Sequence, residues 1–151
     1  LGIEYSRKRI RRYVRKIERR GVPLPNLRLI WRPARDLIGP FLSPGKVSTF
    51  HIYFPDPWPK AHHARYRLIT PELVSALHGS LVAHGRVDLA TDSAEYAEEM
   101  REAFDAVGGW QAEDVRVDFE ARAAEGRITV FEERWRALGR SIQFLRYRKE
   151  A

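Results

Sequence analysis

Short apolar runs of strand length alternate along this chain with segments of helical periodicity, and this alternation limits the folds open to it. The runs with strand character are residues 1–5, 26–31, 47–54, 86–92, 113–121 and 141–148. The segments with helix signals are residues 6–20, 70–85, 93–108 and a short stretch from 129. A repeated strand–helix–strand order predicts an α/β fold, with a mostly parallel sheet and helices on both of its faces.

Capping residues predict where the first two helices begin and end. Ser6 suits the N-cap of a helix whose apolar positions recur on one face, and Gly21 suits its terminator. Thr70, followed by a proline, predicts the beginning of a second helix, and Gly85 predicts its end. The pattern from 129 to 132, "TVFE", matches the S/T-x-x-E capping box at the start of a further helix.

The size and composition of the chain predict a single domain spanning residues 1–151, since no low-complexity linker or internal repeat divides it. The absence of Cys excludes disulfides, thiolate metal sites and a Cys nucleophile. No apolar run approaches the roughly 20 residues that cross a bilayer, and the first residues lack the order of a signal peptide. These features favour a cytoplasmic protein without a membrane partner.

Basic residues are concentrated near the beginning of the chain. The formal net charge is +7, and residues 6–20, "SRKRIRRYVRKIERR", carry nine Lys or Arg against one Glu. Concentrated positive charge favours a polyanionic partner, because each neutralised phosphate releases counterions. The alternative is a solvated helix face on a basic protein, and this segment alone does not decide between the two.

Three carboxylates lie at or just after the ends of strands of the expected sheet: Glu4, Asp56 and Asp92. Parallel sheets bind ligands beyond the carboxyl ends of their strands, so we expect these side chains to converge on one edge. The strand before Asp56, residues 47–54, is apolar on both faces, as buried parallel strands are. Glu4 could hold the two hydroxyls of a ribose, or lie on the surface near a helix N-terminus. Asp92 or Ser93 suits the N-cap of the helix that follows.

The segment "FPDPWPK", residues 54–60, has proline at every second position. Proline fixes φ and removes an amide donor, so the loop is expected to be rigid and to present Asp56 beside the ring of Trp58. This pair suits a purine, whose N–H groups a carboxylate accepts while an aromatic ring stacks on the base. The alternative is a proline-rich turn whose Trp fills the core.

The residues after this loop are basic, which shifts the interpretation toward nucleic acid. They are Lys60, His62, His63, Arg65 and Arg67. The two adjacent His lack the ligand spacing of a zinc site, so no metal site is expected. We interpret the two His as phosphate or sugar contacts, or as surface residues.

Taken in order, these segments resemble the bacterial tRNA (guanine-N7)-methyltransferase family. The resemblance rests on "LGIEYSRK", "NLRLI", "FPDPWPKAHHARYRL", "LATD" and "TVFEERWRALG", in the family's order and spacing over nearly the whole chain. It implies a Rossmann-like class I methyltransferase fold, S-adenosyl-L-methionine as cofactor and tRNA as substrate. The methyl group would pass to N7 of a guanine in the variable loop. The family contains monomers and dimers, so the chain is expected to be a monomer or a homodimer.

The resemblance also implies roles for single residues. Glu4 would bind the ribose of the cofactor, and Ala34 lies in the segment that reaches its adenine. Asp56 would be the catalytic carboxylate, in contact with both the cofactor and the target guanine. The expected substrate contacts are Lys60, Asp92, Thr129 and Glu132.

The sequence departs from the family pattern at three places. The family's first strand and glycine-rich cofactor loop would precede Leu1, so the chain is expected to be a fragment of a longer protein. Pro33 stands where the family usually has an Asp that binds adenine, a contact that Asp36 or a backbone group would have to replace. Gly126 and Arg127 stand where Arg-Pro often precedes the "TxxE" segment.

Three functions therefore stay open at this point. The first is the tRNA (guanine-N7)-methyltransferase, which the intact "FPDPWPK" loop favours, and a second is a methyltransferase for another nucleic acid, which the specificity of that loop disfavours. The third is a non-catalytic RNA-binding remnant of the same fold, which the missing glycine-rich loop favours. If the chain is the whole polypeptide, weak or no cofactor binding is expected.

Overall fold

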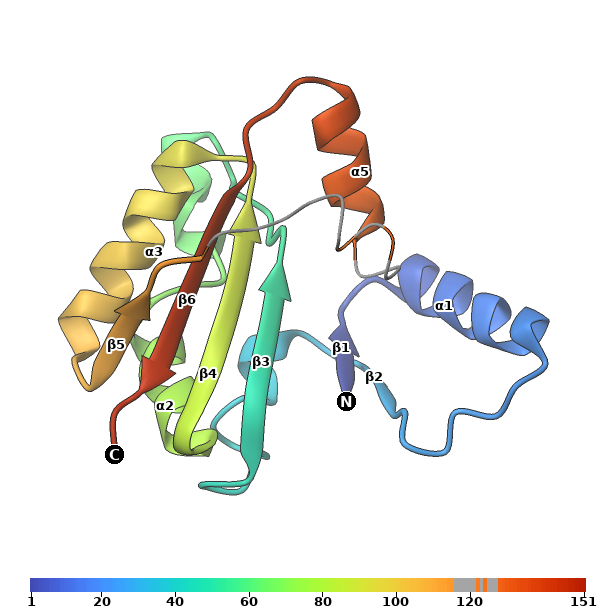
Figure 1. Cartoon of the computed structure of the whole chain (residues 1–151), viewed down its shortest axis with the longest axis horizontal. Coiled ribbons are helices and arrows are strands. Elements are labelled where there is room, and N and C mark those ends of the chain that lie inside the picture. Colours follow the sequence, from blue (N-terminus) through green and yellow to red (C-terminus); the bar gives the residue numbers. More distant parts are fainter. Residues whose placement is uncertain (116–121, 123, 125–127) are drawn as a thin grey trace. The chain divides into compact units, whose positions relative to one another are not determined.

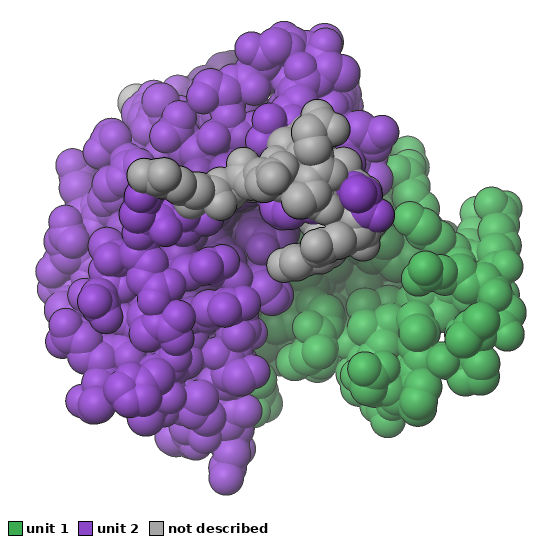
Figure 2. Space-filling view, in the orientation of Figure 1, with its two compact units in different colours: residues 1–42 green, residues 43–151 purple. Residues whose placement is uncertain are grey.

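The computed structural model describes residues 1–115, 122, 124 and 128–151. The chain forms two compact units, residues 1–42 and residues 43–151 (Figure 2). The expectation of a single domain over the whole chain stays a prediction. Within the described residues, no helix combines the length and the apolar character that a membrane span requires.

Unit 1 is built on a strand–helix–strand crossover (Figure 1). β1 (Gly2–Glu4) and β2 (Leu29–Trp31) pair in parallel, and α1 (Arg7–Arg20) connects them in the sequence. A 3-10 turn, η1 (Ala34–Asp36), follows β2. Of residues 1–42, all of which the structure describes, Ile38 alone is buried. Unit 1 therefore has little apolar core of its own.

α1 begins and ends at the predicted capping residues. The Ser6 hydroxyl accepts a hydrogen bond from the amide of Arg9 at 3.4 Å. Gly21 follows the helix with φ of +63°, a left-handed conformation that glycine adopts without steric cost. No residue of α1 is buried. The helix therefore depends on its caps and on intrinsic propensity more than most helices of globular proteins do.

Unit 2 contains a four-stranded sheet in the order β3-β4-β6-β5 (Figure 1). Its strands are β3 (Val47–Tyr53), β4 (Leu81–Thr91), β5 (Trp110–Glu113) and β6 (Gln143–Lys149). β3 and β4 are parallel, whereas β6 runs antiparallel to both of its neighbours, β4 and β5. Among the described strands, the parallel pairing expected from the sequence thus holds for β1 with β2 and for β3 with β4.

The core of unit 2 lies between this sheet and two helices packed beside each other, α2 (Pro71–Ser80) and α3 (Ala94–Val107). Phe104 of α3 stacks on Tyr147 of β6, with 3.9 Å between ring centroids. Leu77 of α2 and Val87 of β4 are fully buried. Two further helices occur in the connections, η2 (Ala61–Tyr66) after β3 and α5 (Val130–Ala137) before β6.

The expectation of a helix over residues 70–85 is wrong at its C-terminal end. α2 ends at Ser80, and the residues that follow belong to β4. The cause is tertiary packing, because Leu81 is fully buried and its carbonyl accepts a hydrogen bond from Lys149 Nζ at 3.1 Å. Gly85 lies inside β4, where an added Cβ would come within 2.9 Å of the Leu81 side chain. The glycine therefore permits close packing and does not end a helix.

Two strands also differ from the sequence-based expectation. β3 is an edge strand of the four-stranded sheet, and His51 in its middle is exposed. The expected burial of residues 47–54 on both faces is therefore wrong. The strand expected at residues 113–121 is wrong in its described part: β5 spans Trp110–Glu113, and Asp114 and Val115 lie outside it. Residues 116–121 of that expected strand lie outside the described residues.

Candidate functional site

The loop of residues 54–60, here called the Asp56 loop, has an unusual backbone. Phe54 and Trp58 have φ angles of +54° and +43°, in the left-handed region that residues with a Cβ rarely occupy. The Phe54 amide donates to the carbonyl of Ala90 on β4 at 2.7 Å, which anchors the start of the loop. Asp56 itself is exposed. Strained residues of this kind persist only where their surroundings hold them, and they cluster at functional sites.

A buried arginine holds the far side of the Asp56 loop. Arg67 is 4% exposed, and its guanidinium donates to the carbonyls of Pro57, at 2.6 Å, and Trp58, at 3.3 Å. The same group forms ion pairs with two acids of α3, Glu99 and, at 2.9 Å, Glu95. The hydrogen bond to Glu99 and then that to Glu95 raise the pKa of Arg67 against the opposing effect of burial. The cation therefore ties the loop to α3.

This placement separates Arg67 from the rest of the basic run that favoured a nucleic-acid partner. Its charge is neutralised by two carboxylates and its side chain is buried, so it is a structural residue. Because α3 begins just after Asp92, the ion pairs of Arg67 also link the two segments that carry Asp56 and Asp92. Lys60 and Arg65 are exposed, and the expected substrate contact of Lys60 stays a prediction.

Trp58 belongs to a partly exposed aromatic cluster and does not fill the core. Its ring lies 5.6 Å from the ring of His63 and 5.5 Å from that of Tyr66, both in η2. The Tyr66 hydroxyl accepts a hydrogen bond from Arg65 at 2.9 Å. Asp56 is exposed and lies two residues before Trp58 in the same loop. A carboxylate can accept hydrogen bonds from a planar heterocycle while an aromatic side chain stacks on it.

Asp92 follows β4 and is held by an ion pair. Its Oδ2 lies 2.6 Å from Nη1 of Arg140, whose guanidinium also lies over the ring of Trp135. The N-cap of α3 is Ser93, whose hydroxyl accepts from the amide of Tyr96. Capping therefore does not require the Asp92 carboxylate.

We expect Asp92→Asn to lower the free energy of unfolding by less than about 1 kcal/mol, because ion pairs with a solvated partner contribute about 0–1 kcal/mol. The Arg140 side chain is 52% exposed. Urea unfolding measures the change, and Arg140→Gln should lower the free energy by a similar amount. A loss of several kcal/mol in either variant would show that the pair holds the fold together.

The start of α5 forms one half of the predicted capping box. The Thr129 hydroxyl accepts a hydrogen bond from the Glu132 amide at 3.0 Å. The Glu132 side chain is 1% exposed, and its Oε1 lies 2.8 Å from Nη1 of Arg122. The carboxylate is therefore neutralised by an arginine, and its expected role as a substrate contact stays a prediction.

Three of the segments that carry predicted site residues meet in unit 2. Tyr53 pairs with Ala90 near the carboxyl ends of β3 and β4, so the segments that hold Asp56 and Asp92 leave the sheet at adjacent strands. The rings of Phe54 and Phe131 are stacked with 5.9 Å between centroids, which brings the first turn of α5 to the start of the Asp56 loop. Burial, and then the charge of Asp88, raise the pKa of Tyr53, so its phenol is neutral near pH 7.

Glu4 and Ala34 lie in unit 1, where Glu4 is the last residue of β1 and Ala34 follows β2. Glu4 Oε1 accepts from the amide of Ser6 at 2.8 Å, and its Oε2 lies 3.5 Å from Nη1 of Arg9. Ala34 opens η1, directly after Pro33. Both lie at the carboxyl ends of paired parallel strands, the edge at which α/β sheets bind ligands. The expected convergence of Glu4 with the aspartates of unit 2 stays a prediction.

The arginines that hold these acids were not recognised from the sequence. Arg140 and Arg122 are 48 and 10 residues from their partners, and no local pattern marks them. A signal for Arg67 exists, because Glu95 and Glu99 lie one turn apart on the predicted third helix. Two acids on one helix face indicate a shared cation, although they do not say which one.

The sequence model of a family described as "Putative methyltransferase" matches residues 1–145. The chain is 38% identical over 154 residues to a tRNA (guanine-N(7)-)-methyltransferase of Leifsonia xyli subsp. xyli, covering 98% of this chain and 64% of that protein. It is 31% identical over 151 residues to a protein of the same name from Pseudoalteromonas atlantica, a match that covers 100% of this chain and 62% of that protein. The chain thus spans less than two thirds of the length of these relatives.

Solved methyltransferase structures have the same fold. The aminoglycoside resistance methyltransferase NpmB1 matches with a TM-score of 0.58 at 15% identity, over 98% of this chain and 74% of that one. An S-adenosylmethionine dependent methyltransferase from Mesorhizobium loti matches with a TM-score of 0.53 at 12% identity. This match covers 98% of this chain and 79% of that one. At such low identity these matches bear on the fold alone, and they confirm the class I methyltransferase fold expected from the sequence.

Proposed function

Because this chain belongs to the putative methyltransferase family whose sequence model it matches, we propose that it serves as a tRNA (guanine-N7)-methyltransferase. The reaction would transfer a methyl group from S-adenosyl-L-methionine to N7 of a guanine in the tRNA variable loop, in the cytoplasm. The observation that carries the proposal is the Asp56 loop, whose exposed carboxylate stands on a strained backbone held by Arg67.

The chemistry of guanine explains why an exposed carboxylate, without a strong general base, is enough for methylation at N7. N7 carries a lone pair and no proton, so methylation there requires no strong general base. The protein has to orient the base and to stabilise the positive charge that develops on the purine. An ionised Asp56 does both, by accepting the N–H groups of the base and by its own charge. The cluster of Trp58, His63 and Tyr66 supplies rings on which a base can stack.

The residues of unit 1 fit the nucleoside part of the cofactor. When bound, S-adenosyl-L-methionine supplies the electrophilic methyl group. The Glu4 carboxylate has lone pairs beyond those used by Ser6 and Arg9, so it can accept hydrogen bonds from ribose hydroxyls. Ala34 would lie against the adenine. Pro33 has no acceptor in its side chain, so a backbone carbonyl or the exposed Asp36 would bind the adenine amino group.

Calorimetry of S-adenosyl-L-methionine with Glu4→Gln tests this assignment. We expect affinity to fall by about 10-fold to 100-fold, because a hydrogen bond to a charged group contributes about 1.5–3 kcal/mol. Arg9→Gln is the control, since it removes the ion pair of Glu4 and leaves the ribose acceptor in place. Equal losses in the two variants would contradict a direct contact. No binding by the parent chain would contradict cofactor binding and favour an RNA-binding remnant.

A further inference from the structure

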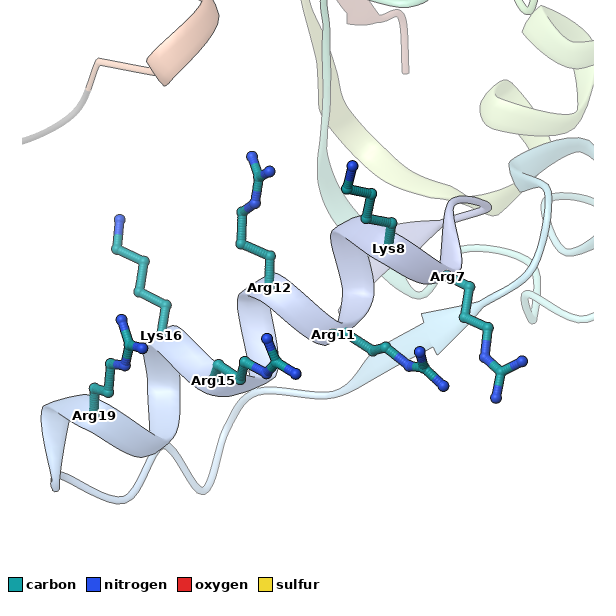
Figure 3. A pocket seen from close by; sticks show the side chains of 7 residues that line it. All are labelled: Arg7, Lys8, Arg11, Arg12, Arg15, Lys16 and Arg19. Atoms are coloured by element: carbon teal, nitrogen blue, oxygen red, sulfur yellow. The ribbon is translucent and has the colours of Figure 1, made fainter.

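α1 carries its positive charge in two rows. Steps of four residues define one row of Arg and a second, mixed row beside it, and together they line a shallow groove of about 730 Å³ (Figure 3). The first row is Arg7, Arg11, Arg15 and Arg19, and the second is Lys8, Arg12 and Lys16. Four residues of α-helix rise about 6 Å, so each row presents charges at short and regular intervals. We call these seven residues the cationic surface of α1.

Little in the described chain neutralises this surface. Glu18 is the only acid in α1, and none of the seven side chains forms an ion pair with another described residue. The ion pair of this helix joins Glu4 to Arg9, which lies outside the rows. Like charges four residues apart destabilise a helix, and no residue of α1 is buried to compensate. A partner that supplies negative charge would explain the arrangement.

The chemistry of the rows favours the phosphates of a nucleic acid. Five of the seven side chains are Arg, whose planar guanidinium binds phosphate oxygens in pairs. Their regular spacing suits the repeated charge along a nucleic-acid strand. An anionic membrane is the other common partner of a basic helix. Membrane-surface helices place Trp, Phe or Leu in the bilayer, and α1 contains none of these.

We propose that the cationic surface of α1 binds the phosphate backbone of tRNA. The choice of tRNA among RNAs rests on the proposed function. Phosphate contacts position a nucleic acid and carry no sequence information, whereas contacts to bases select. The surface therefore holds the tRNA, and the choice of guanine belongs to the Asp56 loop.

The salt dependence of tRNA affinity tests the proposal. For the 151-residue chain and an unmodified tRNA transcript, the logarithm of the association constant is measured against the logarithm of KCl concentration. Each phosphate contact contributes about 0.7–0.9 to the slope. Joint replacement of Arg11, Arg15 and Arg19 by Gln should lower the slope by about 2–3. Gln is a good helix former, and circular dichroism checks that the helix is retained.

Arg20→Gln is the matched control for Arg19→Gln, because it removes the same charge from the same helix outside the rows. Arg19→Gln should lower the slope by about 0.7–0.9, and Arg20→Gln should leave it nearly unchanged. Equal changes of slope in these two variants would overturn the proposal. A slope equal to that of the parent chain in the variant with Gln at positions 11, 15 and 19, the triple variant, would also overturn it. Binding of the parent chain to phosphatidylglycerol vesicles and not to tRNA would overturn it in favour of a membrane.

Transfer of labelled methyl groups to the same tRNA separates this proposal from the proposed function. The parent chain could bind tRNA in a salt-dependent way, with weaker binding in the triple variant, and yet transfer no methyl groups. That result would contradict the proposed function and support tRNA binding by the cationic surface of α1. Methyl transfer by the parent, with an unaltered slope in the triple variant, would support the function and overturn the surface.

Discussion

Asp56→Asn should lower the rate of methyl transfer to tRNA by about 10²-fold to 10³-fold, the usual effect of removing one electrostatic contact to a transition state. The amide keeps the size of the side chain and loses the negative charge that, in the proposed function, would stabilise the methylated purine. The rate is measured with labelled S-adenosyl-L-methionine and a tRNA transcript, and strand cleavage at N7-methylguanine identifies the position.

The control for this variant is Asp105→Asn, the same chemical change at an exposed position of α3. It should leave the rate within about twofold, because surface substitutions away from a site have small effects. An Asp56→Asn protein as active as this control would contradict the catalytic role of Asp56. Activity at a nucleotide other than guanine would contradict the proposed reaction.

Arg67→Met should lower the free energy of unfolding by about 2–3 kcal/mol, near the lower limit for removing one member of a buried ion pair. The Glu95 and Glu99 side chains are 69% and 41% exposed, so water solvates them when the cation is lost. The carbonyls of Pro57 and Trp58 lose a charged donor as well. Urea unfolding followed by tryptophan fluorescence measures the change.

Arg101→Met is the comparison for that variant, because Arg101 of α3 also pairs with an acid, Glu98, at 2.6 Å. Both partners of this pair are at least partly exposed, so the loss should be below about 1 kcal/mol. A similar loss in the two variants would show that Arg67 does not hold the Asp56 loop. Arg67→Lys should recover only part of the stability, since an ammonium cannot reproduce the guanidinium fork.

For two of the helices, α1 and α3, local signals in the sequence predicted both ends. α1 lies between Ser6 and Gly21, and α3 lies between Ser93 and Gly108, as expected. Capping acts through hydrogen bonds within one turn, so the residues that cause it are neighbours in the sequence. The choice of Ser93 over Asp92 as the cap required the structure, because both side chains are chemically able to fill that position.

The features that sequence analysis missed depend on residues far apart in the chain. The end of α2 is set by the burial of Leu81 and by Lys149, which lies 68 residues away. Glycine is typical of the end of a helix, which is why Gly85 was expected to end one. In the structure it lies inside a packed strand. The edge position of β3 depends on sheet order, which no pattern within residues 47–54 encodes.

In the candidate site, too, the features set by local sequence were predicted and those set by distant contacts were missed. Asp56 and Asp92 were expected at one edge, because side chains that follow parallel neighbours leave a sheet together, and the pairing of β3 with β4 confirms that much. The burial of Arg67 was missed because a basic residue within a basic run is typical of a solvated surface. Only contact with α3 distinguishes it from Arg65, which is exposed.

The position of β6 determines when the sheet of unit 2 can form during synthesis. β6 is the last described strand, yet it lies between β4 and β5. Until the ribosome has released residues 143–149, β5 has no described strand to pair with and Phe104 lacks the ring of Tyr147. Pairings between distant residues form slowly, and exposed strand edges aggregate. A nascent chain that stalls before β6 therefore exposes strand edges and should aggregate more readily than one that has released β6.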